Sequence, residues 1–192
     1  MRKVLMGAVA APSILALAAC GGAATEEPAE EATAVAEEAA AEEEAAAEEV
    51  AAAEVEPVPA AEPNGTVIEV EMLTRDPDTG RQVFKPRVVT AQVGDTIRFV
   101  ATDPTHQTES IADMLPPGVT GWKGAINEEY EYVVPTPGIY GYKCAPHYAA
   151  GMVGIIVVEG EGQNDNLAAA KAVKHIGLAS TVFEEMFAEI EG

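Results

Sequence analysis

The stretch that decides the fold is residues 139–158, which read IYGYKCAPHYAAGMVGIIVV. Its first part places Tyr140, Tyr142 and Cys144 at every second position, which is the period of a β-strand with one buried face. Its last part, residues 153–158, is a continuous apolar run that is typical of a buried strand. The stretch therefore predicts two strands joined by a loop, with Cys144 at the end of the first strand.

Similar short runs surround this stretch and are separated by turn residues, such as Asp76-Pro77-Asp78-Thr79-Gly80. The predicted strands are residues 66–73, 88–92, 96–101, 129–134, 139–144 and 153–158. Many short strands at this spacing indicate a mainly β protein that forms a sandwich or a barrel.

The tail has a different pattern, which predicts two short α-helices over about residues 166–190 that pack on the β domain. Residues 166–174 are rich in Ala, and Gly177 stands where the first helix would stop. Residues 181–184, Thr-Val-Phe-Glu, match a capping box for the second helix. Its apolar stripe consists of Phe183, Met186, Phe187 and Ile190. Such a stripe more often packs on a core than binds a partner.

The first residues match an export signal. Met1-Arg2-Lys3 is basic, an apolar run follows, and Leu17-Ala18-Ala19-Cys20 then resembles the end of a bacterial lipoprotein signal. The resemblance implies a signal peptide over residues 1–19, an acylated Cys20, and a protein anchored to the inner or outer membrane in the periplasm. An ordinary signal peptide and an uncleaved anchor are the alternatives. If Cys20 carries lipid, Cys144 has no partner for a disulfide.

Residues 20–63 form a low-complexity linker before the folded domain, which we expect over residues 64–192. Between residues 22 and 63 there are 14 Glu and no positive charge, and few side chains there could build a core. We expect a disordered, self-repelling spacer, because a long surface helix would need an apolar stripe. The formal charge of the whole chain is -21, which argues against nucleic acid as a partner, since phosphate binding needs a basic face.

The loop after Cys144 contains His147 and Met152, so a thiol, an imidazole and a thioether lie close together in the sequence. His106 follows another predicted strand, and strand ends gather at one end of a sandwich. Such a soft donor set suits copper, whereas zinc, the main competing metal, makes little use of a thioether. Taken singly, these residues also have ordinary roles: a solvated His, a packed Met and a buried Cys. His175 in the helical tail is expected to be structural or exposed.

The folded part resembles the pseudoazurins, small type 1 blue copper proteins of the cupredoxin, or plastocyanin-like, family. The resemblance lies in residues 93–96 (VGDT), 126–128 (INE), 137–144 (PGIYGYKC), 146–148 (PHY) and 151–154 (GMVG). It implies a cupredoxin Greek-key β-sandwich with two short C-terminal helices. The copper ligands that it implies are His106, Cys144, His147 and Met152. We hypothesise that Met152 is the weak axial ligand of this set.

The same resemblance implies a function and partners. Electrons would pass singly between periplasmic redox proteins, such as a nitrite reductase or a cytochrome c, and we expect a monomer. A lipoprotein that stores or delivers copper is the alternative. An enzyme is not expected, because a full ligand set leaves no open position for a substrate.

Residues around the ligands extend or alter the family pattern. Gln107 stands where the family usually has an Asn that braces the ligand loops, and Pro146 has no N–H to donate to the Cys144 sulfur. Lys123 and Lys143 match positions in a ring of lysines and would steer an acidic partner. The expected docking surface consists of Tyr148, Ala149 and Ala150.

Overall fold

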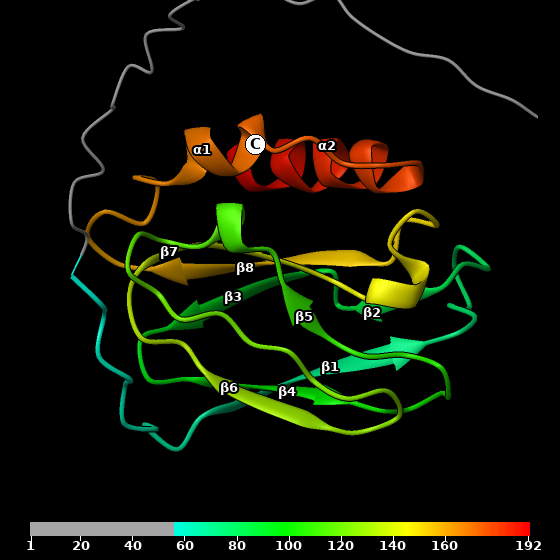
Figure 1. The fold of residues 1–192 in the computed structure, drawn as a ribbon, viewed down its shortest axis with the longest axis horizontal. Helices are drawn as coiled ribbons and strands as arrows, with labels where there is room; N and C mark the ends of the chain where they lie inside the picture. Colours follow the sequence, from blue (N-terminus) through cyan, green and yellow to red (C-terminus); the bar gives the residue numbers. More distant parts are fainter. Residues whose placement is uncertain (1–55) are drawn as a thin grey trace, which may run out of the picture. The chain divides into compact units, whose positions relative to one another are not determined.

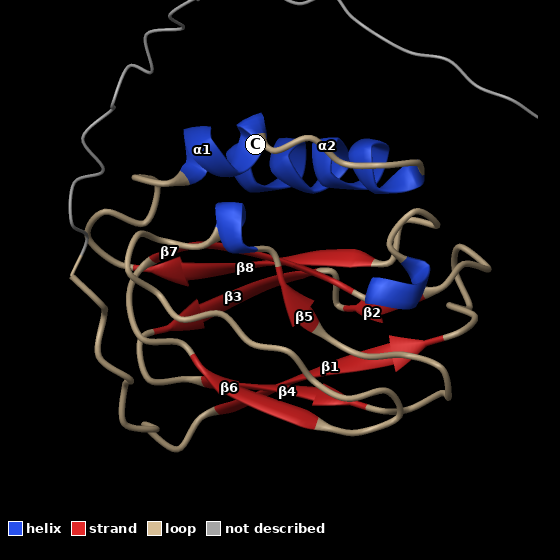
Figure 2. Cartoon of the chain, viewed as in Figure 1, coloured by secondary structure: helices blue, strands red, loops and turns tan. Residues whose placement is uncertain are grey.

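The computed structural model describes residues 56–192, which form two β-sheets and a layer of helices (Figure 1 and Figure 2). The strands are β1 (Val67–Leu73), β2 (Val83–Lys85), β3 (Val88–Gln92), β4 (Thr96–Val100), β5 (Glu109–Ser110), β6 (Tyr130–Val133), β7 (Gly138–Lys143) and β8 (Val153–Glu159). The helices are α1 (Leu167–Ala172) and α2 (Leu178–Glu191), and two short 3-10 turns are η1 (Ala112–Met114) and η2 (Ala145–His147).

One sheet has the strand order β2-β1-β4-β6, and the other has the order β3-β8-β7-β5. Each contains one parallel pair, β1 with β4 and β3 with β8, among antiparallel neighbours. The prediction of a mainly β sandwich with two C-terminal helices is therefore confirmed. The strands β2 and β5 were not predicted, because they are too short to show an alternating pattern.

Alternation along the strands builds the core between the sheets. On β4, Ile97 and Phe99 are fully buried, while Arg98 points outward and pairs with carboxylates on both neighbouring strands. Tyr142 and Cys144 also point into this core, as predicted. The same core contains four aromatic rings in contact: Phe84, Phe99, Trp122 and Tyr142. Cys144, at the end of β7, thus belongs to a closely packed core.

The helices cover the outer face of the sheet that contains β7 and β8 (Figure 1). The predicted apolar stripe packs there, in a second core. The two helices span the predicted range of about 166–190, but the predicted boundary between them is wrong. Val173 has an extended backbone that ends α1, and Gly177 (φ 57°, ψ -136°) comes immediately before α2 instead of ending α1. Thr181 therefore lies inside α2 and does not cap it.

The chain already contacts the domain before Asn64. The Val58 N–H donates to the Gly118 carbonyl (2.8 Å), and the Asn64 side-chain amide donates to the Asp95 carboxylate (2.7 Å). Cys20, the predicted signal peptide and most of the predicted linker lie outside the described residues. Among residues 56–192, no helix has the length and apolar character needed to cross a membrane.

Candidate metal centre

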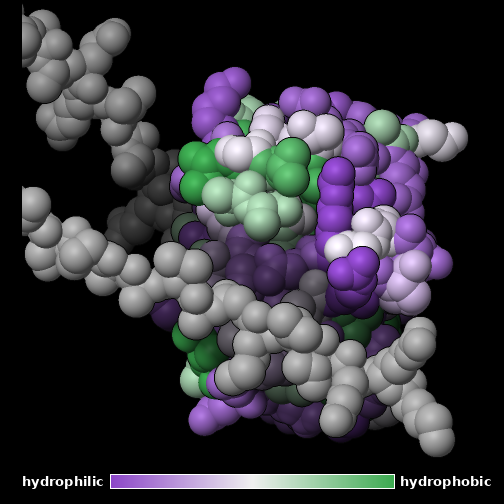
Figure 3. Space-filling model, turned by 90° about the vertical axis from the view of Figure 1, so that its right-hand side faces the viewer, coloured by the Kyte–Doolittle hydropathy of each residue, from purple (hydrophilic) through white to green (hydrophobic). Residues whose placement is uncertain are grey.

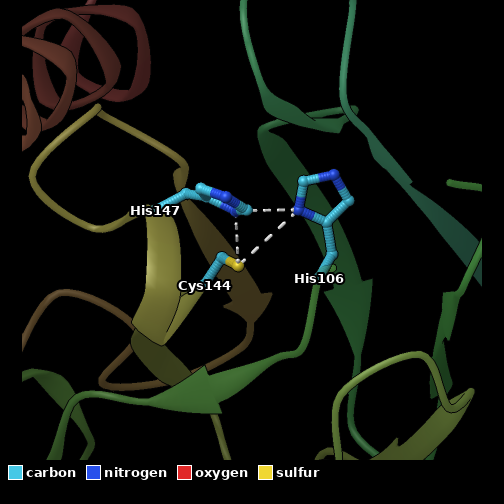
Figure 4. Close-up of side chains that lie close together, drawn as sticks. All are labelled: His106, Cys144 and His147. Carbon is cyan, nitrogen blue, oxygen red and sulfur yellow. Dashed lines mark hydrogen bonds between the residues drawn. The ribbon is translucent and has the colours of Figure 1, made fainter. Parts of the chain in front are cut away.

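Three side chains from two loops meet at one end of the sandwich: His106 from one loop, and Cys144 and His147 from the other (Figure 4). His106 lies in the loop after β4, Cys144 directly follows β7, and His147 ends η2. The pairing of β5 with β7, in which Glu109 lies opposite Lys143, holds the first loop beside the end of β7. The register of this short pairing therefore places His106 next to Cys144.

The donor atoms are close enough to share one ion. The Nδ1 atoms of His106 and His147 are 3.1 Å apart, and the Cys144 Sγ lies 3.8 Å and 3.5 Å from them, respectively. Nitrogen and sulfur donors around a single ion, with bonds of ~2.0–2.3 Å, lie roughly 3.3–3.6 Å apart in a tetrahedral arrangement. The three separations, 3.1–3.8 Å, bracket this range, and shifts of about 0.2 Å would let all three donors share one ion.

Contacts on both sides fix His106, which is fully buried. Its Nε2 lies 3.0 Å from the Thr74 hydroxyl, which leaves Nδ1 facing the site. The Asn127 N–H donates to the His106 carbonyl (2.9 Å), and the Asn127 side chain accepts the Thr105 N–H. Burial lowers the pKa of His106, and the charge of His147 lowers it further. The ring is therefore neutral at pH 7 and able to bind a metal.

Cys144 is a buried, free thiol. Burial raises the pKa of this thiol, while the backbone N–H groups of Gln107 and His147 partly oppose the rise. Pro146, lacking an N–H, adds no hydrogen bond to the sulfur. A thiol of this kind gives up its proton when a metal cation takes the proton's place.

Met152 is fully buried at the end of the ligand loop, and its backbone closes that loop. Its N–H donates to the His147 carbonyl (3.2 Å), and its own carbonyl accepts the Cys144 N–H (3.0 Å). The fourth predicted donor is thus tied through the backbone to two of the other three. One thiol, two imidazoles and a thioether form the soft set that suits copper.

The side chain of Gln107 is turned toward Glu109, to which its amide donates (3.2 Å). Glu109 also pairs with Lys123 (3.3 Å) and Lys143 (3.5 Å). The two lysines expected to steer a partner are therefore partly neutralised. The first ligand loop is braced by Asn127, which bonds to His106 and Thr105. Sequence reasoning missed Glu109, because its position beside both lysines depends on the two-residue strand β5.

Several exposed apolar residues lie in the same loop as the half-buried His147. The residues expected to dock a partner directly follow it: Tyr148 is half-buried, and Ala149 and Ala150 are exposed. Ile176 and Leu178 are 58% and 46% exposed and lie close by, since the Leu178 N–H donates to the Ala149 carbonyl (2.9 Å). Figure 3 shows the side of the molecule that carries η2, where hydrophobic residues gather near the helices. The tail thus adds apolar surface to this end of the domain.

His175 does not join the ligand cluster. Its ring stacks on Phe183, with 4.1 Å between the ring centroids, and its Nδ1 lies 2.6 Å from the Tyr148 hydroxyl. The expectation that His175 is a structural residue agrees with this packing. Its contact with the residue after His147 was not foreseen.

Comparisons with known proteins point to one family. A profile of copper binding proteins, the plastocyanin/azurin family, matches residues 70–159. The chain is 47% identical to a pseudoazurin of Paracoccus pantotrophus over 106 residues, which cover 55% of this chain and 71% of that protein. A Sinorhizobium pseudoazurin structure matches with a TM-score of 0.63 and 42% identity, covering 66% of this chain and 98% of that one. The structure of a pseudoazurin from Hyphomicrobium denitrificans matches with a TM-score of 0.60 and 38% identity, covering 65% of this chain and 98% of that one.

Proposed function

Because the chain belongs to the pseudoazurin family of copper-binding cupredoxins, we propose that it carries single electrons while held at a membrane in the periplasm. The observation that carries this proposal is the cluster of His106, Cys144 and His147. Their donor atoms lie within 4.8 Å of one another, and the backbone ties Met152 to the same loop.

His106, Cys144, His147 and Met152 would hold one copper ion, which supplies one-electron chemistry because copper is stable as Cu(I) and as Cu(II). The protein contributes fixed donor positions. His106 is held by Thr74 and by Asn127, and Cys144 stands at the end of a strand in the core. Donors that are held in this way need little movement when the charge of the site changes, which favours fast electron transfer.

We propose that a redox partner docks over His147, the one half-buried member of a cluster whose other two members are fully buried. The neighbouring surface is apolar, with Ala149, Ala150, Ile176 and Leu178 exposed. The Lys143 ammonium lies 5.3 Å from the centroid of the Tyr148 ring, so one charged side chain borders this surface. Small contacts of this kind support short encounters, as electron carriers need.

Electrostatic steering of a redox partner is weaker than it would be if Lys123 and Lys143 had no acidic neighbour. The Glu109 carboxylate lies within 3.5 Å of both ammonium groups, so the three side chains keep one net positive charge. The chain from Asn64 onward also has 18 acidic and 9 basic residues. We therefore expect association with an acidic partner to depend only modestly on salt.

The N-terminal sequence supports a tether. An acylated Cys20 would anchor the protein, since two or more acyl chains hold stably to a bilayer. The acidic linker would keep the domain away from an anionic membrane surface and still hold it at a high local concentration near membrane-bound redox enzymes. A nitrite reductase or a cytochrome c is the kind of partner that we propose.

Electron transfer and copper delivery make different predictions for the copper-loaded full chain. A carrier should accept one electron per copper from ascorbate, return it to ferricyanide, and keep its copper for hours in a mild chelator. A storage or delivery protein should lose copper to the chelator within minutes. Rapid loss would therefore favour the alternative function.

The tether is tested by growth with a radioactive fatty acid. Label should enter the wild-type protein and should be lost in Cys20→Ala, while the copper-loaded domain stays intact. Unlabelled, soluble wild-type protein would contradict the anchor without affecting the copper site.

A further inference from the structure

A set of contacts joins the C-terminal helical segment to the turn that carries His147. Tyr148 directly follows this ligand, and its hydroxyl lies 2.6 Å from the Nδ1 of His175, with the two rings at 89°. Burial lowers the pKa of His175, so its imidazole is neutral at pH 7 and accepts a hydrogen bond from the Tyr148 hydroxyl.

His175 is itself firmly held. Its ring stacks on Phe183 at an angle of 27°, and Phe183 is only 1% exposed, in the core between α2 and the sheet. The other ring nitrogen, Nε2, is buried and has no hydrogen-bond partner among the described residues. Leaving a buried polar atom unpaired is costly, and an apolar side chain would avoid that cost. Compared with an apolar side chain, the advantage of an imidazole at this position is therefore its hydrogen bond with Tyr148.

The backbone makes a second link between the same two segments. The Leu178 N–H donates to the Ala149 carbonyl (2.9 Å). Gly177 allows this approach, because a Cβ at that position would overlap the Ala149 carbonyl oxygen. On the other side of the loop, a Cβ at Gly151 would lie 3.1 Å from Val182. The ligand loop thus lies directly against the start of α2.

The turn has little stability of its own. The 3-10 turn η2 has three residues, none of them buried, and no side-chain cap, and such short turns are held by their surroundings. The carbonyl of His147 accepts the N–H groups of Ala150 (3.1 Å) and Met152 (3.2 Å), and the carbonyl of Tyr148 accepts the Gly151 N–H (2.9 Å). A tilt of this turn would consequently move His147 and Met152 together.

We propose that His175 is a positioning residue for the copper site: its hydrogen bond to Tyr148 fixes the turn that carries His147 and, through the backbone, Met152. The helical tail then helps to set the ligand positions in addition to covering the sheet. The effect on copper rests on the proposed function, whereas the effect on the turn holds in the metal-free protein as well.

The metal-free full chain provides the first test. Tyr148→Phe removes only the hydroxyl, and His175→Leu removes the acceptor. In both variants we expect the amides of Ala150, Gly151 and Met152 to exchange with solvent about three- to tenfold faster, as the loss of one hydrogen bond implies. The β8 amides should exchange at the wild-type rate, which shows that the fold is intact. The control variant, Lys174→Ala, changes an exposed neighbour and should have no effect.

The copper-loaded full chain provides the second test. Tyr148→Phe and His175→Leu should shift the visible spectrum and the midpoint potential, and the double variant should shift them no further than either single variant, because the two residues act as a unit. His175→Gln offers a carbonyl oxygen as acceptor and should restore most of the wild-type behaviour.

Wild-type exchange rates in both single variants would overturn the proposal, and so would additive shifts in the double variant. A wild-type chain that takes up no copper would instead contradict the proposed function. The exchange measurement would still decide the role of His175 in that case.

Discussion

Substitution of Gly177 by Ala tests the contact between the ligand loop and the helical tail. The change adds a Cβ to a residue with φ 57°, and this Cβ would overlap the Ala149 carbonyl oxygen. A non-glycine residue in such a sparsely populated backbone region (φ 57°, ψ -136°) costs about 1–3 kcal/mol. Separating the segments also breaks the hydrogen bond from the Leu178 N–H to Ala149, worth about 0.5–1.5 kcal/mol. The total loss of stability is therefore about 1.5–4.5 kcal/mol.

Gly80→Ala is a matched control, because Gly80 also has a positive φ (69°) but no atom within 4 Å of its would-be Cβ. Urea unfolding of the metal-free chains should show Gly177→Ala to be less stable than Gly80→Ala by about 1 kcal/mol, the value of the lost hydrogen bond. After copper loading, the visible spectrum should change in Gly177→Ala alone. Equal stability of the two variants, together with unchanged spectra, would refute the claim that the tail presses on the ligand loop.

Three further predictions concern charge. Glu109→Gln should free Lys123 and Lys143, so that association with an acidic redox partner is faster at low salt and falls more steeply with added salt; an unchanged salt dependence would contradict the neutralising role of Glu109. Burial raises the pKa of the Cys144 thiol, so copper binding should release a proton from it. The copper affinity, measured by competition with a chelator, should therefore rise about tenfold per pH unit between pH 6 and 8. A copper affinity that does not change with pH would argue against thiolate ligation. The Lys85 ammonium holds the pKa of Asp76 at about 2, so the stabilisation from Asp76 is complete above pH 4 and is lost as the pH falls toward 2. The difference in urea midpoint between wild type and Asp76→Asn should shrink over that range, and a constant difference would count against the pairing.

The sequence carried enough information to predict the sandwich and to single out the residues that the structure brings together as a candidate metal site. Strands such as β4 and β7 alternate buried and exposed side chains over several residues, so their period and inward faces are visible without coordinates. The candidate ligands are suggested by the chemistry of Cys144, His147 and Met152 in one loop, together with a His after another strand. These features are local, and each is repeated or reinforced nearby in the chain.

What the sequence could not provide depends on contacts between distant segments. Glu109 lies beside its two lysines only because of a two-residue strand pairing. The start of α2 is fixed by the close approach of Gly177 to Ala149. Local capping patterns do not encode this contact between distant residues, so the capping box at Thr181 predicted the wrong start for α2. The partner of Tyr148 is 27 residues further along the chain, and no periodicity links the two.

We propose that Cys144 and two histidines form a blue copper site. The most direct measurement is the visible and EPR spectrum of the metal-free full chain after addition of one equivalent of Cu(II), beside Cys144→Ser treated in the same way. We predict an intense blue colour in the wild type that one electron equivalent of ascorbate bleaches reversibly, and no such colour in the variant. A colourless wild-type protein, or one that binds zinc in preference to copper, would contradict the claim.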